Sequence, residues 1–158
     1  MIAIRKILAC IDFSNYSLMT MEYAVDQAKA FQAQIIAFNV VNHRDITAIE
    51  KVSKLPEYVT VEGYFKKVKA KRHDLLRKMI KEHFFEDKSR MSIVIEEGLP
   101  SECILKTIEK EGVDLVVMAN KGRGDVARVL FGSTAEKVFR HSPVSILGVR
   151  ERARFRRK

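Results

Sequence analysis

The stretch from residue 114 to residue 141 constrains the fold of this chain more than any other. It begins with a short apolar run at residues 115–118, continues with a polar loop that contains two glycines, and then changes to a helical pattern that opens at Gly132. Many α/β proteins hold phosphate groups with a buried strand that leads through a glycine loop to a helix N-terminus. Glycine lets the backbone approach the anion, and the first N–H groups of the helix point at it. The stretch therefore predicts an α/β protein with an anion site after this strand.

The spacing of the glycines in this stretch is more specific than its composition. Gly122 and Gly132 are separated by nine residues, Ser133 follows directly, and Ala119 lies three residues before Gly122. This arrangement resembles the nucleotide-binding signature of the universal stress protein family, G-x2-G-x9-G-[S/T], with Ala119 in place of the first glycine. The flanking segments VVMANKGRG and LFGSTAEKVFRHSPVSILGV are similar to the family as well, and the resemblance extends over residues 1–149.

The rest of the chain alternates between apolar runs, typical of buried strands, and amphipathic patterns, typical of helices. We expect five strands, at residues 7–11, 34–41, 91–95, 115–118 and 144–149. We expect four main helices, the first after a cap at Ser14 or Ser17, and the others at residues 61–85, between Pro100 and Gly112, and from Gly132 to a point before Ser142. A further short helix is expected near residues 47–52.

This alternation of strands and helices implies a parallel sheet with right-handed crossovers. The predicted fold class is α/β, with one open parallel five-stranded sheet and helices on both faces. The family resemblance implies the strand order 3-2-1-4-5. The predicted domain covers residues 1–149, and residues 150–158 form a basic C-terminal tail.

The resemblance also implies a ligand and a site. In the implied strand order, the crevice lies where the chain reverses direction, beyond the C-terminal ends of the first and fourth strands. The implied ligand is ATP, with Mg²⁺ bound through the phosphates. By resemblance Asp12 lies at the ribose, Val40 packs on the adenine, and Met118 and Ala119 lie beneath the ribose. The residues that would line the phosphates are Gly122, Arg123, Gly132, Ser133 and Thr134.

Each of these residues also has a purely structural interpretation. Asp12 can cap the first helix, Val40 can belong to the core, Gly132 can be a helix-start glycine, and Arg123 can be a loop cation. Ala119 is the departure from the signature. Its β-carbon either crowds the ligand or costs about 1–2 kcal/mol if the backbone there is left-handed. Family members without the glycines do not all hold ATP, so a nucleotide-free dimeric scaffold of the same fold stays an alternative.

The formal net charge of +9 raises the question of nucleic acid. Residues 150–158 hold six Arg or Lys and one Glu, so they contribute +5 and leave 9 − 5 = +4 for the rest of the chain. The basic signal is therefore mostly a tail, which argues against nucleic acid as a partner, although a nucleic-acid-associated protein working through this tail remains a second alternative. The lysines at residues 66–71 and Arg72 could bind polyanions, but a solvated helix face is favoured.

Other features restrict the location and chemistry of the protein. Cys10 and Cys103 do not make a disulfide framework, and no apolar run reaches the length of a membrane span, so we expect a cytoplasmic protein without membrane contact. The four histidines, at positions 43, 73, 83 and 141, show no metal spacing, and neither a P-loop nor a dinucleotide fingerprint is present. No general base is identifiable, so we expect a stress-response sensor or regulatory module, not an efficient enzyme, in which slow ATP hydrolysis is conceivable. The resemblance implies a homodimer through the apolar fifth strand, from Val144 to Val149, and the protein partner is unknown.

Overall fold

A parallel sheet of five strands in the order β3-β2-β1-β4-β5 forms the centre of the structure, as predicted. The computed structural model describes residues 2–44, 60–122 and 131–151. The expected short helix near residues 47–52 lies outside these described residues. The strands are β1 (Lys6–Cys10), β2 (Gln34–Asn42), β3 (Met91–Gly98), β4 (Leu115–Ala119) and β5 (Ser145–Val149).

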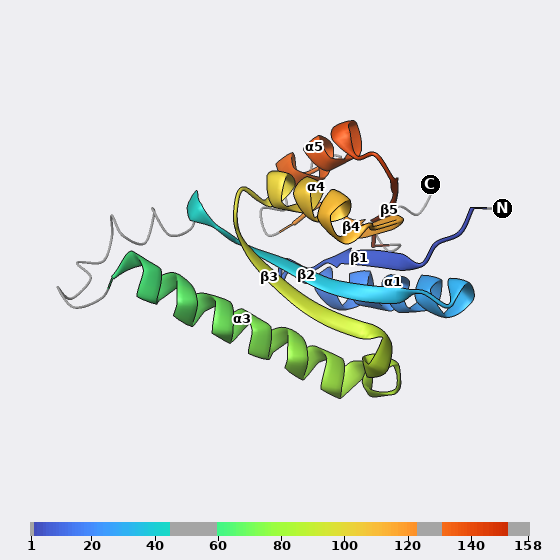
Figure 1. The fold of residues 1–158 in the computed structure, drawn as a ribbon, viewed down its shortest axis with the longest axis horizontal. Helices are drawn as coiled ribbons and strands as arrows, with labels where there is room; N and C mark the ends of the chain where they lie inside the picture. The colour runs from blue at the N-terminus through green and yellow to red at the C-terminus, as the bar shows by residue number, and fades with distance from the viewer. Residues whose placement is uncertain (1, 45–59, 123–130, 152–158) are drawn as a thin grey trace, which may run out of the picture.

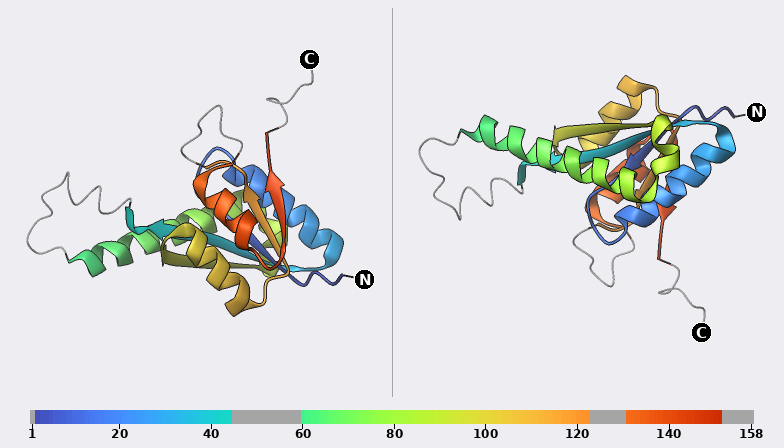
Figure 2. Two further views of the ribbon diagram at one scale, coloured as in Figure 1. Left: turned by 90° about the horizontal axis from the view of Figure 1, so that it is seen from above. Right: turned by 90° about the horizontal axis from the view of Figure 1, so that it is seen from below.

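Different helices cover the two faces of the sheet (Figure 1). The helices α1 (Ser17–Phe31) and α3 (Val61–His83) lie on one face, and α4 (Pro100–Glu111) and α5 (Ser133–His141) lie on the other. The views from above and below show the same two layers (Figure 2). Successive side chains of a strand point to opposite faces, so Ile7 and Ala9 join the core under α1 and α3, whereas Leu8 joins the core under α4 and α5.

The ends of the elements agree with the sequence in most places and correct it in a few. Gly112 ends α4 in the left-handed conformation with φ 63°, and Pro100 stands in its first turn, both as predicted. The prediction that Ser14 or Ser17 caps α1 is wrong, because Tyr16 is the N-cap and has no side-chain cap hydrogen bond. The second and third strands are longer than expected and continue to Asn42 and Gly98.

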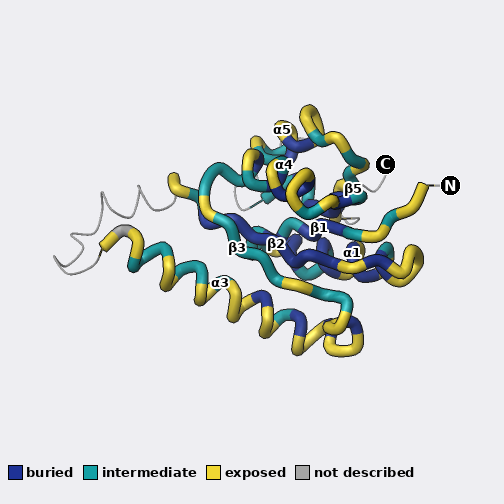
Figure 3. The backbone as a smooth tube through the Cα atoms, in the orientation of Figure 1, coloured by how far each residue is buried: buried dark blue, intermediate teal, exposed yellow. Residues whose placement is uncertain are grey.

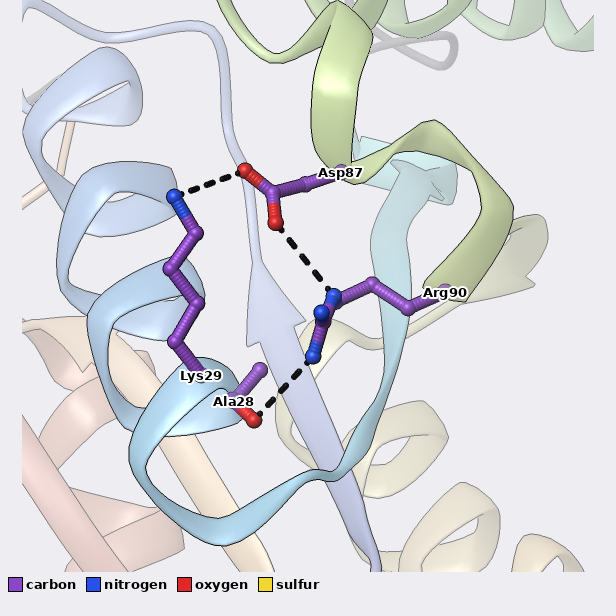
Figure 4. Close-up of polar contacts among 4 residues, drawn as sticks. All are labelled: Ala28, Lys29, Asp87 and Arg90. Atoms are coloured by element: carbon purple, nitrogen blue, oxygen red, sulfur yellow. Dashed lines mark hydrogen bonds and ion pairs between the residues drawn. The ribbon is translucent and has the colours of Figure 1, made fainter.

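A short 3₁₀ helix, η1 (Phe85–Arg90), connects α3 to β3 and is fixed to the end of α1 by a cluster of charges (Figure 4). The carboxylate of the buried Asp87 forms ion pairs with Lys29 at 3.0 Å and with Arg90 at 3.3 Å. Arg90 also donates a hydrogen bond of 3.3 Å to the Ala28 carbonyl. A buried carboxylate needs such partners. The expected helix at residues 61–85 ends at His83, before η1 begins.

The long helix α3 is less buried than the central strands of the sheet (Figure 3). Leu76 and Ile80 are buried, whereas the described α3 residues before Leu76 are exposed or only partly covered. The N-terminal half of α3 is therefore held by fewer apolar contacts than its C-terminal half. In the described part of the chain, no helix combines the length and the apolar character that crossing a membrane requires.

Candidate functional site

A cavity of about 380 Å³ opens at the C-terminal ends of β1, β2 and β4, next to the first turns of α4 and α5. It forms because β1 ends at Cys10, whereas β2 continues to Asn42 along β3, so the two strands separate there. The reversal of chain direction between β1 and β4 places the cavity at the position expected for ligands of open α/β sheets. Its wall consists of Cys10, Ile11, Asp12, Phe38, Asn39, Val40, Asn42, Pro100, Ile104, Met118, Ala119, Asn120, Lys121, Gly122, Gly132, Ser133, Thr134 and Ala135.

The wall contains every predicted site residue that the structure describes, and Arg123 lies outside the described residues. Sequence reasoning missed the contribution of Asn39 and Asn42 from β2 and of Pro100 and Ile104 from α4. The argument that ligands bind beyond strand ends could have found the two asparagines, because both lie near the C-terminal end of β2. The α4 residues could be placed only once the position of that helix over the sheet was known.

Asp12 is held by the turn that follows β1. One oxygen, Oδ1, accepts hydrogen bonds from the Ser14 N–H at 3.0 Å and from the Ser17 hydroxyl at 3.3 Å. The interpretation of Asp12 as the helix cap is wrong, because the N-cap of α1 is Tyr16 and the carboxylate orders the turn before it. Phe13, directly after Asp12, has φ 59°, a left-handed conformation that is strained for a bulky residue.

The second carboxylate oxygen of Asp12 faces the glycine loop. A β-carbon built on Gly122 would lie 2.7 Å from Asp12 Oδ2, closer than real β-carbons approach any atom. Gly122 therefore makes room for a side chain of the protein itself, a role that the sequence did not indicate. Through this contact the turn after β1 and the loop after β4 meet on one side of the cavity.

The side of the cavity formed by β2 combines apolar residues with a buried polar residue. Val40 is only 7% exposed and packs in the same core cluster as Met118 and Ile104. Next to Val40, the amide nitrogen of the buried Asn39 donates a hydrogen bond of 2.7 Å to the Ile11 carbonyl. Arg72 of α3 donates to Asn39 Oδ1 at 3.0 Å and to the Val40 carbonyl at 2.7 Å.

This position of Arg72 revises the interpretation of the basic cluster on α3. The side chain turns toward the end of β2 and does not join the lysines of the helix face. Lys66, Lys67 and Lys71 are exposed, and Lys69 lies 3.8 Å from the Glu97 carboxylate. These contacts agree with the favoured interpretation of a solvated face. In the sequence, Arg72 stands in a gap of the apolar stripe of this helix, between Val68 and Leu75, and this gap was the signal for its different role.

The first turn of α5 closes the other end of the cavity. Gly132 is the N-cap, and its N–H donates a hydrogen bond of 2.7 Å to the Asn120 carbonyl. The first backbone bond of the helix runs from Glu136 N to Gly132 O, so the N–H groups of Ser133 and Thr134 precede the helical ladder, and both residues line the cavity. Such N–H groups, with the positive end of the helix dipole, are suited to bind an anion.

No described neighbour requires glycine at position 132. Its φ of −68° is open to every residue, and an added β-carbon would have no described atom nearer than 3.7 Å. Ala119 is the last residue of β4, opposite Val149, and it is not among the described residues with positive φ. The expectation of left-handed strain at Ala119 is therefore wrong, and only the possibility of crowding a ligand remains.

Cys10 lies on the wall next to these groups. Burial and the nearby Asp12 carboxylate raise the pKa of its thiol to about 12. The thiolate is the reactive form, so Cys10 is a poor nucleophile at neutral pH. Within residues 2–44, 60–122 and 131–151, no three His, Cys, Asp or Glu side chains are grouped so as to hold a metal ion.

Comparison with known proteins identifies the family. Residues 3–150 match the universal stress protein family, so the chain belongs to it. Universal stress protein MJ0577 of Methanocaldococcus jannaschii is 29% identical, over 94% of this chain and 96% of that protein. A universal stress protein of Methanothermobacter thermautotrophicus is 31% identical, over 92% of this chain and 95% of that protein.

Solved structures agree with this assignment. The structure of MJ0577, then called a hypothetical protein, superposes with a TM-score of 0.75 at 26% identity and covers 95% of this chain and 98% of its own. A universal stress protein in complex with cAMP superposes with a TM-score of 0.63 at 21% identity, over 94% of this chain and 98% of its own. The single-domain α/β fold with strand order 3-2-1-4-5 is thus that of the family.

Proposed function

We propose that this universal stress protein binds ATP in the cavity between the ends of β1 and β4 and acts as a cytoplasmic stress-response sensor or regulatory module. The observation that supports the proposal is convergence. Residues assigned to base, ribose and phosphates from separate parts of the chain line one cavity of about 380 Å³. This volume lies within the range of about 300–1,000 Å³ that is usual for small-molecule sites.

The chemistry of the wall fits the three parts of a nucleotide. Val40, Met118 and Ile104 offer an apolar surface to a base, and the free edge of the Asp12 carboxylate can accept hydrogen bonds from ribose hydroxyls. The start of α5, with Gly132 and Ser133, offers N–H and hydroxyl donors to phosphates. Mg²⁺ would be held through the phosphates, since the described wall has one carboxylate, that of Asp12.

The residues of this wall favour binding of ATP over its hydrolysis. Asp12 is already engaged by Ser14 and Ser17, and no second carboxylate or histidine stands beside it on the described wall. A general base must lie within hydrogen-bond reach of the water that it activates. We therefore propose a binding module in which any hydrolysis of ATP is slow.

Two measurements test this proposal. Calorimetry with ATP and Mg²⁺ should show saturable binding, and mass spectrometry of the denatured protein should detect a released adenine nucleotide. One solved protein of this fold holds cAMP, so titration with cAMP in parallel asks which adenine nucleotide this cavity prefers. No heat at millimolar ATP together with no released nucleotide would contradict the proposal and favour the nucleotide-free scaffold.

We further propose a homodimer through β5. This strand is the edge of the sheet, it pairs with β4 on one side, and Ile146 and Leu147 are only partly buried. An apolar sheet edge tends to pair with another chain. Light scattering at micromolar concentration should show a dimer that Ile146→Lys disrupts. Phe85→Lys, on the exposed η1 near the opposite edge, is the matched control and should leave the dimer intact.

A further inference from the structure

A buried polar network connects α3 to the strands behind the cavity. Arg72 Nη1 donates to Asn39 Oδ1 at 3.0 Å and to the Val40 carbonyl at 2.7 Å. The amide nitrogen of Asn39 donates in turn to the Ile11 carbonyl at 2.7 Å. Asn39 is 2% exposed, so both ends of its amide find partners inside the protein.

The network lies where the β1–β2 ladder stops. The register of this pair ends at Cys10 opposite Phe38, and the Ile11 N–H still donates to the Phe38 carbonyl at 2.8 Å. Beyond that bond the strands separate to open the cavity, and the Asn39 side chain provides the donor to the Ile11 carbonyl. A side-chain amide thus spans the gap where a regular parallel ladder would continue with backbone bonds.

Arg72 reaches this network from the less buried half of α3. The described α3 residues before Leu76 are exposed or only partly covered, and this half of the helix extends away from the middle of the sheet (Figure 1). The two bonds of Arg72 therefore attach α3 to the end of β2. A guanidinium suits this place because it stays charged and presents several donors in a fixed plane.

We infer that Arg72 is a positioning residue for the nucleoside end of the cavity, an inference that rests on the proposed function. Arg72 is not part of the cavity wall. It fixes the backbone of Val40, the proposed base contact, and through Asn39 it fixes the Ile11 carbonyl, one residue before Asp12. Arg72 thereby sets the separation between the base contact and the ribose contact, which both belong to the end of the cavity formed by β1 and β2.

The test compares Arg72→Met with Arg77→Met. Arg77 lies on the same helix, its side chain is 71% exposed, and it pairs with Asp74 at 3.2 Å, so this control removes the same charge without touching the network. Calorimetry uses three probes, which are ATP, adenosine and inorganic tripolyphosphate. Arg72→Met should weaken ATP and adenosine by the same factor, roughly tenfold, since the lost bonds are charge-assisted. Tripolyphosphate affinity should not change, and Arg77→Met should alter none of the three.

Conservative variants separate positioning from loss of fold. Arg72→Lys keeps the charge with a single ammonium and should recover part of the adenosine affinity. Asn39→Asp keeps an acceptor for Arg72 and removes the donor to Ile11, so it should weaken adenosine and spare tripolyphosphate even if Arg72→Met does not fold. If the wild type binds ATP and adenosine and the variants bind them with the same affinity, this inference alone is overturned. It is also overturned if the variants lose as much affinity for tripolyphosphate as for adenosine. A wild-type protein that binds none of the probes would overturn the proposed function and this inference together.

Discussion

The two ends of the cavity are built by different means. At the end formed by β1 and β2, side chains fix one another: Asp12 is bound by Ser14 and Ser17, and Asn39 is bound by Arg72. At the end formed by α5, a backbone bond holds the start of the helix, from the Gly132 N–H to the Asn120 carbonyl. A change at the first end must disturb the protein as well as a ligand, whereas a change at the second end can disturb a ligand alone.

Two neighbouring glycines of the cavity wall show how the needs of the protein and those of a ligand can differ. Gly122 has no room for a β-carbon because Asp12 Oδ2 would lie 2.7 Å from it. Gly132 has room, since the nearest described atom would lie 3.7 Å away, and its φ of −68° suits any residue. Glycine at position 122 therefore leaves the Asp12 carboxylate in its place, and a side chain there would displace it. At position 132 the need for glycine would come from what occupies the cavity.

The largest expected effect is that of Gly132→Val on ATP binding. A branched side chain at the start of α5 would stand where we place the phosphates, and losing about 3 kcal/mol of contacts weakens binding more than a hundredfold. Calorimetry should detect no binding, while the ligand-free protein still folds, with only the modest loss of stability expected when valine replaces glycine at an N-cap. Unchanged ATP affinity would show that no ligand approaches Gly132.

Gly112→Ala is the control for Gly132→Val, because it should affect stability and not binding. Gly112 ends α4 at φ 63°, where an alanine costs about 1–2 kcal/mol, although no described atom lies within 4 Å of the added β-carbon. This variant should therefore lose thermal stability and keep its ATP affinity. The pair of variants separates the effect of a ligand from that of the backbone.

The next effect concerns Asp12 and Gly122 together. Asp12→Ala should weaken ATP and ADP alike by about tenfold or more, because the ribose is common to both and bonds to a charged group contribute roughly 1.5–3 kcal/mol. Gly122→Ala should weaken binding as well, by displacing the carboxylate. In the Asp12→Ala background the same alanine should add little, since the two sites are in contact. Additive losses would contradict the proposed role of Gly122.

Ser133→Ala should weaken ATP by about tenfold through the loss of one hydroxyl donor to phosphate. Ser133 is in the first turn of α5, so the backbone N–H groups remain and the loss should be smaller than for Gly132→Val. Adenosine affinity, measured in the same way, should not change. A parallel loss for adenosine would mean that Ser133 faces the nucleoside and not the phosphates.

The sequence predicted what depends on pattern and missed what depends on distant contacts. Apolar runs located the five strands, and the glycine spacing located the start of α5 on the cavity wall. The Asp12–Gly122 contact and the Asn39–Arg72 bond join residues far apart in the chain, and no local pattern encodes which side chains will meet. The break in the apolar stripe of α3 at Arg72 was a clue, but it did not reveal the partner.

The smallest expected effect is that of Ala119→Gly. Ala119 ends β4 on the cavity wall, without the positive φ that would make glycine necessary, so its β-carbon can act only by crowding a ligand. Removing it should raise ATP affinity by roughly twofold to threefold, which corresponds to less than about 1 kcal/mol. The same change should lower stability slightly, because glycine in a strand costs about 0.5–1 kcal/mol relative to alanine. Ala37→Gly, in buried β2 and away from the wall, should lower stability without raising affinity. Equal or weaker ATP binding by Ala119→Gly would show that the β-carbon of Ala119 does not crowd the ligand.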